Sequence, residues 1–269
     1  MPEPAGAPSP PSPPSRRLPG KVAVVTGSSG GIGRAIAYEF GREGASVVIN
    51  SRDAERAGAA AAAMERDGLQ ATAFAADIRD PVQARALAST AVERFGRLDV
   101  WVNNAGINVI KPALELEPDE WARVIDTNLS GCFYGAQAAA RYMVPQKSGV
   151  IIQIGSIIGE VGLPRRVPYT AAKHGLIGLT KVLGTEWAKD NVRVVCLDPG
   201  YISAGLGVKS QTRGGAFTAV DIERRTPMGR FGEAVEVARV AVFLASDDAS
   251  YITGSHITVD GGWVAYGGW

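Results

Sequence analysis

Hydrophobic and polar positions follow two rhythms along the chain, beginning at Lys21. Short runs rich in β-branched residues are separated by longer alanine-rich segments whose apolar residues recur at helical spacing. This alternation is typical of βαβ units and a parallel sheet. The runs predict seven strands, at residues 21–26, 45–50, 71–76, 98–103, 150–154, 192–197 and 256–259. Predicted helices cover residues 32–43, 128–144, 167–189 and 233–245, with others ending near Gly68, opening at Asp80-Pro81 and lying around Trp121. We therefore expect an α/β fold, a doubly wound seven-stranded parallel sheet with helices on both faces.

Residues 1–17 differ in composition from the rest of the chain. Half of the 16 prolines lie at or before Pro19, and the segment is rich in alanine and serine. Such a segment cannot bury enough surface to offset its ordering entropy, so we expect a disordered tail whose role is open. It also lacks the apolar stretch of a secretory signal. No later break in composition occurs, so residues 18–269 are predicted to form one domain.

Composition and charge narrow the classes of function. The 28 basic residues nearly balance the 27 acidic ones, so we expect neither nucleic acid nor a membrane as partner. Cys132 and Cys196 lack the spacing of a disulfide framework or a zinc site, which suits a cytoplasmic protein. His174 and His256 lie far apart in the sequence, so no metal site is predicted.

A glycine-rich turn follows the first predicted strand and leads directly into a helix. It reads Gly27-Ser28-Ser29-Gly30-Gly31-Ile32-Gly33. Glycine permits positive φ and lets backbone N–H groups approach a ligand. The helix start adds unsatisfied N–H groups and the positive end of the helix dipole. This placement predicts a site for a dinucleotide pyrophosphate. Its candidate contacts are Gly27, Ser29, Gly31, Ile32 and Gly33.

Three further motifs follow later in the chain. They are Asn103-Asn104-Ala105-Gly106 after the fourth strand, Ser156 after the fifth, and Tyr169 with Lys173 four residues on. Together with the glycine turn, in this order and at these separations, they resemble the classical short-chain dehydrogenase/reductase family over residues 18–263. The resemblance implies a Rossmann-type fold. It also implies hydride transfer between a nicotinamide cofactor and a carbonyl or secondary alcohol of a small molecule.

The chemistry expected of Tyr169 and Lys173 follows from their spacing. Residues four apart on a helix share one face, a turn from each other. A free tyrosine has a pKa of about 10, and a neighbouring ammonium favours the phenolate form. Tyr169 is therefore the predicted acid/base, and Ser156 would donate to the substrate oxygen where charge develops. The resemblance adds that Lys173 binds the nicotinamide ribose and that Asn128 joins it in a water-linked proton relay.

The resemblance also implies the remaining cofactor contacts. They are Asn104, Ala105 and Gly106 on the adenine side, Asp77 and Ile78 after the third strand, and Pro199, Gly200 and Ile202 after the sixth. Asn103 is implied to brace the sheet as much as to bind ligand. A helix cap or turn is the alternative role for Asp77. Ala204 stands where relatives carry a threonine for the nicotinamide carboxamide, which leaves Ser203 or the backbone for that contact.

The end of the second strand bears on the choice of cofactor. It reads Asn50-Ser51-Arg52-Asp53, without the terminal acid that would accept hydrogen bonds from a ribose and repel a 2′-phosphate. Ser51 and Arg52 are candidate contacts, and Arg52 can pair with a phosphate. This favours NADP(H). The adjacent Asp53, and Ser29 in a place where many relatives that use NADP(H) have a basic residue, leave NAD(H) possible. A solvated loop cation is the alternative role for Arg52.

The substrate is less constrained by the sequence. Residues 200–228 are predicted to form a mobile lid, since residues 201–228 are glycine-containing and lack periodicity. Arg165 and Arg166 would receive an acidic substrate or an acyl carrier, with solvated surface cations as the alternative. A 3-oxoacyl thioester reductase is the first expectation, and a sugar or polyol dehydrogenase of glucose or gluconate type the second. A non-catalytic nucleotide sensor is a remote third, because both Tyr169 and Lys173 are kept.

The C-terminal part bears on assembly. Its Ile252-Thr253-Gly254 and Val259-Asp260-Gly261-Gly262 segments resemble those of members that form tetramers, in which the helices matching 128–144 and 167–189 pack across one interface. The tail after them carries Trp263 and Trp269, which we expect to be buried against a neighbouring subunit. A homotetramer is predicted.

Overall fold

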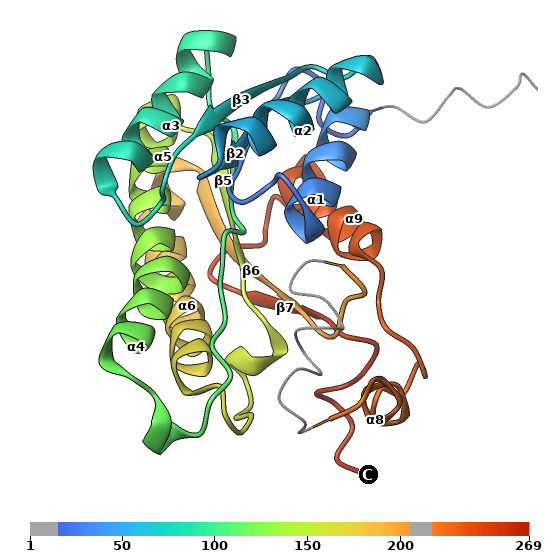
Figure 1. Ribbon diagram of the computed structural model, residues 1–269. Coiled ribbons are helices and arrows are strands. Elements are labelled where there is room, and N and C mark those ends of the chain that lie inside the picture. The colour runs from blue at the N-terminus through green and yellow to red at the C-terminus, as the bar shows by residue number, and fades with distance from the viewer. Residues whose placement is uncertain (1–15, 205–216, 269) are drawn as a thin grey trace, which may run out of the picture.

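Seven parallel strands form one sheet in the order β3-β2-β1-β4-β5-β6-β7 (Figure 1). The computed structural model describes residues 16–204 and 217–268. The strands are β1 Val22–Val25, β2 Ser46–Ser51, β3 Ala71–Ala75, β4 Val100–Asn103, β5 Gly149–Ile154, β6 Val192–Pro199 and β7 His256–Val259. Every residue of β1, β4 and β5 is buried, as expected for strands covered on both faces.

Helices cover both faces of the sheet (Figure 1). One face carries α1 (Gly31–Arg42), α2 (Ala54–Arg66) and α9 (Ala234–Ala245), whose buried side chains share a core with the strands. The other carries α3 (Pro81–Phe95), α5 (Gly131–Gln146) and α6 (Val167–Glu186), which share a second core. The short helix α4 (Pro118–Ile125) packs against α6. The predicted doubly wound, single-domain architecture is confirmed.

A buried polar network holds the centre of the sheet together. The Asn103 amide donates to Cys132 O at 2.8 Å and to Gln153 Oε1 at 3.0 Å, and its Oδ1 accepts from Trp101 Nε1 at 2.7 Å. Because an unpaired buried amide costs free energy, this full set of partners stabilises the packing of β4, β5 and α5. The bracing role expected for Asn103 is therefore visible in its contacts.

The structure differs from the sequence prediction between α4 and α5. The predicted helix over residues 128–144 begins later, at Gly131, and a π-helical turn, Asp126–Ser130, precedes it. Asn128 lies in this turn rather than at a helix start. Such turns are frequent at functional sites, and periodicity does not predict them, because they add a residue without changing the apolar pattern.

The structure also bears on two other predicted segments, the lid at residues 200–228 and the N-terminal tail. A short helix, α8 (Ala219–Arg225), lies in the segment that showed no periodicity. The expected lid lies outside the described residues over 205–216, and the expected tail does so over 1–15. Arg17, which falls within that tail, is held in place: its backbone N–H donates to Glu43 Oε2 at 2.8 Å, and its guanidinium pairs with Asp248.

Within the described ranges, no helix has both the length and the apolar character needed to cross a bilayer.

Candidate active site

A cleft with a cavity of about 540 Å³ opens at the carboxyl ends of the central strands. Ligands of doubly wound folds bind at this edge. Of the predicted site residues, those that line it are Gly27, Ser29, Gly31, Ile32, Ser51, Arg52, Asp77, Ile78, Asn104, Ala105, Gly106, Ser156, Tyr169, Lys173, Pro199, Gly200 and Ile202. Two others, Gly33 and Asn128, are not part of the lining.

The glycine turn is shaped by positive φ and by close contacts. Gly27 and Gly31 have φ of +63° and +60°, values that other residues rarely adopt. A Cβ on Gly33 would lie 2.3 Å from Asn104 Nδ2, an atom that donates to Thr26 O and Gly27 O at 2.9 and 3.1 Å. Gly33 therefore acts behind the cleft, by letting Asn104 brace the turn.

The start of α1 is suited to an anion. Its N-cap is Gly30, and no described side chain caps the helix. The first N–H groups of the helix are left for a ligand, with the dipole favouring negative charge. These features fit the pyrophosphate of a dinucleotide.

Cations lie at the end of β2, where an adenosine ribose would sit. Arg52 lines the cleft, and so does Arg56 from the first turn of α2. The carboxylate of Asp53 caps α2 by accepting from the Arg56 backbone N–H at 3.1 Å, and Asp53 is absent from the lining. Asp53, the acid that weakened the NADP(H) prediction, therefore serves as a helix cap. Sequence reasoning missed Arg56, although a basic residue one turn after Arg52 could have indicated it.

Asp77 lines the cleft next to an arginine. Its carboxylate accepts from Arg79 Nε at 3.0 Å, and this hydrogen bond holds the pKa of Asp77 below its usual value. The Asp77 backbone N–H donates to Gln83 Oε1 at 2.8 Å. The N-cap of α3 is Asp80, so the alternative role of helix cap falls to a neighbour of Asp77, whereas the alternative role in a turn is seen: Asp77 Oδ1 accepts from the Arg79 backbone N–H at 3.0 Å.

Tyr169, Lys173 and Ser156 line the same cleft. Lys173 is 4% exposed, and its Nζ donates to Ile154 O at 2.6 Å. The same Nζ lies 5.5 Å from the centroid of the Tyr169 ring, as their spacing on α6 predicts. Ser156 follows β5 and is nearly buried, with its backbone N–H donating to Asp198 Oδ1 at 3.1 Å. A carbonyl oxygen between Ser156 and Tyr169 would face two hydroxyl donors.

Asn128 is fully buried and lies behind the cleft. Its Oδ1 accepts from the Ile107 backbone N–H at 2.9 Å, and its Nδ2 donates to Ile107 O at 2.8 Å. The side chain thereby fixes the segment that continues from Gly106 into the cleft. The water-linked relay expected for Asn128 stays a prediction.

The substrate end of the cleft contains one of the two arginines that were predicted to receive an acidic substrate, together with Tyr201, which sequence reasoning did not assign to the site. Arg166 lines it and is 4% exposed, while Arg165 does not line it. Tyr201 also lines it, and burial raises the pKa of this tyrosine. Ala204 is part of the lining, whereas Ser203 is exposed and is not part of it.

Trp263 corrects an expectation about the tail. It is 9% exposed within this chain alone, 5.8 Å from the Tyr201 ring and under the Arg225 guanidinium at 4.6 Å. Its burial therefore requires no neighbouring subunit. Trp269 lies outside the described residues.

These features define a class of protein: a doubly wound fold whose cleft is suited to a dinucleotide and is lined by Ser156, Tyr169 and Lys173. The chain belongs to the short-chain dehydrogenase/reductase family, and it is an oxidoreductase that acts on hydroxyl or keto groups. The matching family, described as Enoyl-(Acyl carrier protein) reductase, covers residues 27–264.

Individual relatives differ in their substrates. The chain is 37% identical to the 3-oxoacyl-[acyl-carrier-protein] reductase FabG of Thermotoga maritima, over 92% of this chain and 99% of that protein. It is 42% identical to the 3beta-hydroxysteroid dehydrogenase 1 of Eggerthella lenta, over 93% and 96%. A gluconate 5-dehydrogenase from Burkholderia cenocepacia, solved in complex with NADP and tartrate, is 35% identical with a TM-score of 0.88, over 94% of this chain and 98% of that one. These three relatives are named for the same type of reaction on different substrates. They therefore leave the substrate class of this chain open.

Proposed function

We propose that the protein is an NADP(H)-dependent oxidoreductase that interconverts a ketone and a secondary alcohol on a substrate with a carboxylate near the reacting carbon, as in a sugar acid. The observation that carries the substrate class is Arg166, a buried guanidinium in the wall of the cleft. The remaining site residues supply the reaction itself.

The proton transfer uses the chain's own side chains. In the direction of reduction, the Tyr169 hydroxyl donates a proton to the substrate oxygen, and the Ser156 hydroxyl donates a hydrogen bond to the same atom. The Lys173 ammonium, held by Ile154 O, supplies the positive charge that favours the resulting phenolate. A bound nicotinamide would supply or accept the hydride. In the direction of oxidation, Tyr169 takes the proton back.

Two cations support the preference for NADP(H). A 2′-phosphate at the end of β2 would meet Arg52 and Arg56, both of which line the cleft. Charge-assisted hydrogen bonds from guanidinium to phosphate are short and strong. The Burkholderia relative is named as a complex with NADP. NAD(H) would leave both cations without that partner, so dual use is the weaker expectation.

Arg166 distinguishes a substrate that carries a carboxylate from a neutral one. Burial lowers its pKa, and the neighbouring Tyr201 and Tyr169 oppose that effect. A guanidinium stays charged in proteins and has several N–H donors, so it can hold a carboxylate in addition to other acceptors. The carboxylate of a sugar acid would form an ion pair with this guanidinium, which a neutral polyol cannot do.

Steady-state kinetics with Arg166→Ala tests the substrate class. Oxidation of sugar acids by NADP⁺ should lose about 10- to 100-fold in kcat/KM, the value of one charge-assisted hydrogen bond. Oxidation of neutral polyols should change little. Arg165→Ala is the matched control, since Arg165 is adjacent but outside the lining. Equal losses on charged and neutral substrates would remove the sugar-acid proposal and leave the reaction class intact.

A 3-oxoacyl thioester reductase is the second candidate. It is favoured by the 37% identity to the Thermotoga maritima enzyme over almost that protein's full length. The test is consumption of NADPH with an acetoacetyl thioester. The thioester would be the better substrate class under two conditions. Turnover of this neutral ketone must exceed the turnover of sugar acids, and it must persist in Arg166→Ala.

A further inference from the structure

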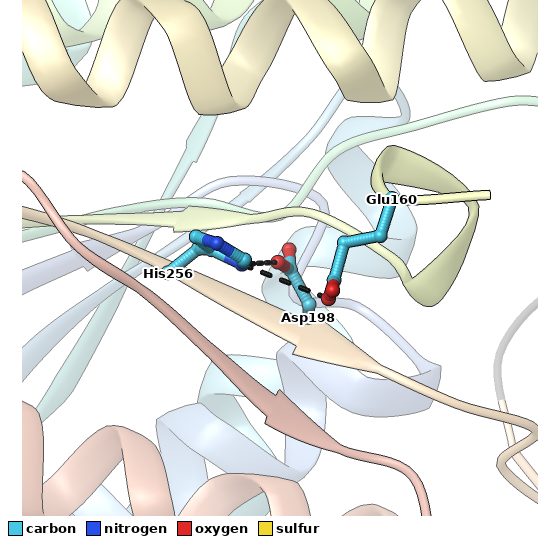
Figure 2. A group of neighbouring side chains, drawn as sticks. All are labelled: Glu160, Asp198 and His256. Carbon is cyan, nitrogen blue, oxygen red and sulfur yellow. Dashed lines mark ion pairs between the residues drawn. The ribbon is translucent and has the colours of Figure 1, made fainter. Parts of the chain in front are cut away.

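Three potential metal ligands converge behind the catalytic serine (Figure 2). Glu160 follows the short 3₁₀ turn after β5, Asp198 lies near the end of β6, and His256 opens β7. His256 Nδ1 is 3.2 Å from Asp198 Oδ2 and 3.6 Å from Glu160 Oε1. All three ligand atoms lie within 4.8 Å of one another. Residues distant in sequence thus form a compact set of one imidazole and two carboxylates.

Asp198 is the member that most requires a cation. Its side chain is fully buried. Its Oδ1 accepts from the Ser156 N–H at 3.1 Å and from Cys196 Sγ at 3.1 Å. Its Oδ2 is buried, accepts no hydrogen bond from the described part of the chain, and faces His256 (Figure 2). A buried carboxylate oxygen is costly unless it is paired or coordinates a metal, and the partner that the structure gives this oxygen is the His256 ring of the same cluster.

The backbone around Asp198 leaves room for this carboxylate. A Cβ on Gly155 would lie 1.8 Å from Asp198 Oδ1 and 2.6 Å from Cys196 Sγ. The absence of a side chain at Gly155 therefore allows the aspartate to sit at the sheet edge and point Oδ2 into the cluster. The position is specific to a carboxylate in this orientation.

The spacing of the ligand atoms fits a small divalent cation. In a tetrahedral zinc site with bonds of about 2.1 Å, neighbouring ligand atoms are about 3.4 Å apart. The two measured separations, 3.2 and 3.6 Å, bracket that value. The side chains of Glu160 and His256 are 25% and 34% exposed, so solvent reaches the cluster and can supply the remaining ligand.

We propose that Glu160, Asp198 and His256 bind a divalent cation of the zinc class. The ion joins the ends of β5, β6 and β7, and through the Asp198 carboxylate it fixes the backbone N–H of Ser156. Its role is structural: it holds the serine's position from behind, and it takes no part in hydride or proton transfer. The sequence prediction of no metal site rested on the separation of the two histidines, and two carboxylates supply the ligands instead.

Zinc titration of the tag-free, chelator-treated full chain tests this site. Isothermal calorimetry with zinc chloride should give about one ion per chain, and zinc should raise the midpoint of thermal unfolding relative to the chelator-treated protein. His256→Ala and Glu160→Gln should weaken zinc binding by more than about 100-fold, since even an outer-shell change costs 10–100-fold. Both residues are partly exposed, so the variants are expected to fold.

His174→Ala is the matched control, because it removes the other histidine of the chain, an exposed side chain on α6. It should bind zinc as the parent protein does. The proposal is overturned if the parent protein shows no stoichiometric binding, or if His256→Ala and His174→Ala bind zinc equally. Either result would show that the contacts of His256 with the two carboxylates do not serve to hold a metal.

Discussion

At the scale of single residues, the proposed mechanism depends on Tyr169 and Lys173. Tyr169→Phe removes only the hydroxyl, so the fold and the cofactor cleft should persist while the proton donor is lost. General acid–base groups contribute roughly 10²- to 10⁴-fold, and kcat/KM should fall by about that factor. NADPH binding, followed by fluorescence titration, should stay within about twofold of the parent value, far below the change for loss of one hydrogen bond. A variant with unchanged kcat/KM would exclude Tyr169 as the acid/base.

Arg52 and Arg56, which line the same cleft, carry the proposed preference for NADP(H). Arg52→Ala should raise KM for NADPH by about 10- to 100-fold, because a phosphate loses a charge-assisted partner. KM for NADH should change little, which separates phosphate recognition from general damage. Arg66→Ala, at the last turn of the same helix α2, serves as the control. If KM rises equally for both cofactors, Arg52 is not the phosphate contact.

How far the site could be predicted differs from residue to residue. The sequence motifs located Tyr169, Lys173 and Ser156 because each follows a strand or repeats at helical spacing. The role of Asp53 could not be predicted in this way, because capping α2 depends on where the helix starts. Arg166 could not be separated from Arg165 by sequence either, since only the fold decides which of two adjacent cations faces the cleft.

At the scale of secondary-structure elements, the turn before α1 requires glycine at position 33. Gly33→Ala would place a methyl group 2.3 Å from Asn104 Nδ2 and 2.8 Å from Gly27 O, so the turn or its asparagine must move. Overpacking of this kind costs about 1–3 kcal/mol of stability. We expect a lower midpoint of thermal unfolding and weaker NADPH binding.

Gly58→Ala is the matched control for Gly33→Ala. Gly58 lies within α2, and a Cβ there meets nothing within 4 Å. Alanine is favoured over glycine in a helix by about 1 kcal/mol, so this variant should be slightly more stable with unchanged NADPH binding. Similar losses in both variants would show that the contact with Asn104 is not what requires glycine at position 33.

Element boundaries show why a sequence pattern carries only part of the fold. Strands buried on both faces, such as β1 and β5, were predicted because apolar runs mark them. The short helix α8 was not predicted, although Thr218 and Asp221 form a capping box at its start. Its single buried side chain, Ile222, is too little for an amphipathic period. Short helices depend on tertiary contacts more than on pattern.

At the scale of the whole molecule, the parallel sheet brings the distant motifs together. The register pairs β1 with β4, β4 with β5 and β5 with β6, so the segments after these strands meet at one edge. The same geometry gathers Glu160, Asp198 and His256, which no local pattern relates. The parallel sheet therefore forms the predicted cleft. It also brings together these three residues, whose separation in the sequence gave no indication that they are neighbours.

At the scale of the whole molecule, the remaining prediction is that the chain assembles into a homotetramer. The helices α5 and α6 cover the same face of the sheet and carry large apolar side chains toward solvent, Phe133 and Val182, which are 36% and 59% exposed. Exposed apolar side chains of this kind on two helices of one face make that face a candidate interface. With Trp263 buried inside its own chain, the homotetramer proposal rests on these helices.

Val182→Asp tests that interface by placing a charge where apolar packing is expected. Multi-angle light scattering should give the parent protein four times the chain mass and the variant a smaller species, because an unpaired charge is costly to bury. Val82→Asp on α3 is the control, since Val82 is 61% exposed, close to the value for Val182, and lies on a different helix. It should keep the parent mass. A monomeric parent protein would remove the homotetramer, whereas a tetramer that tolerates Val182→Asp would place the interface on another surface.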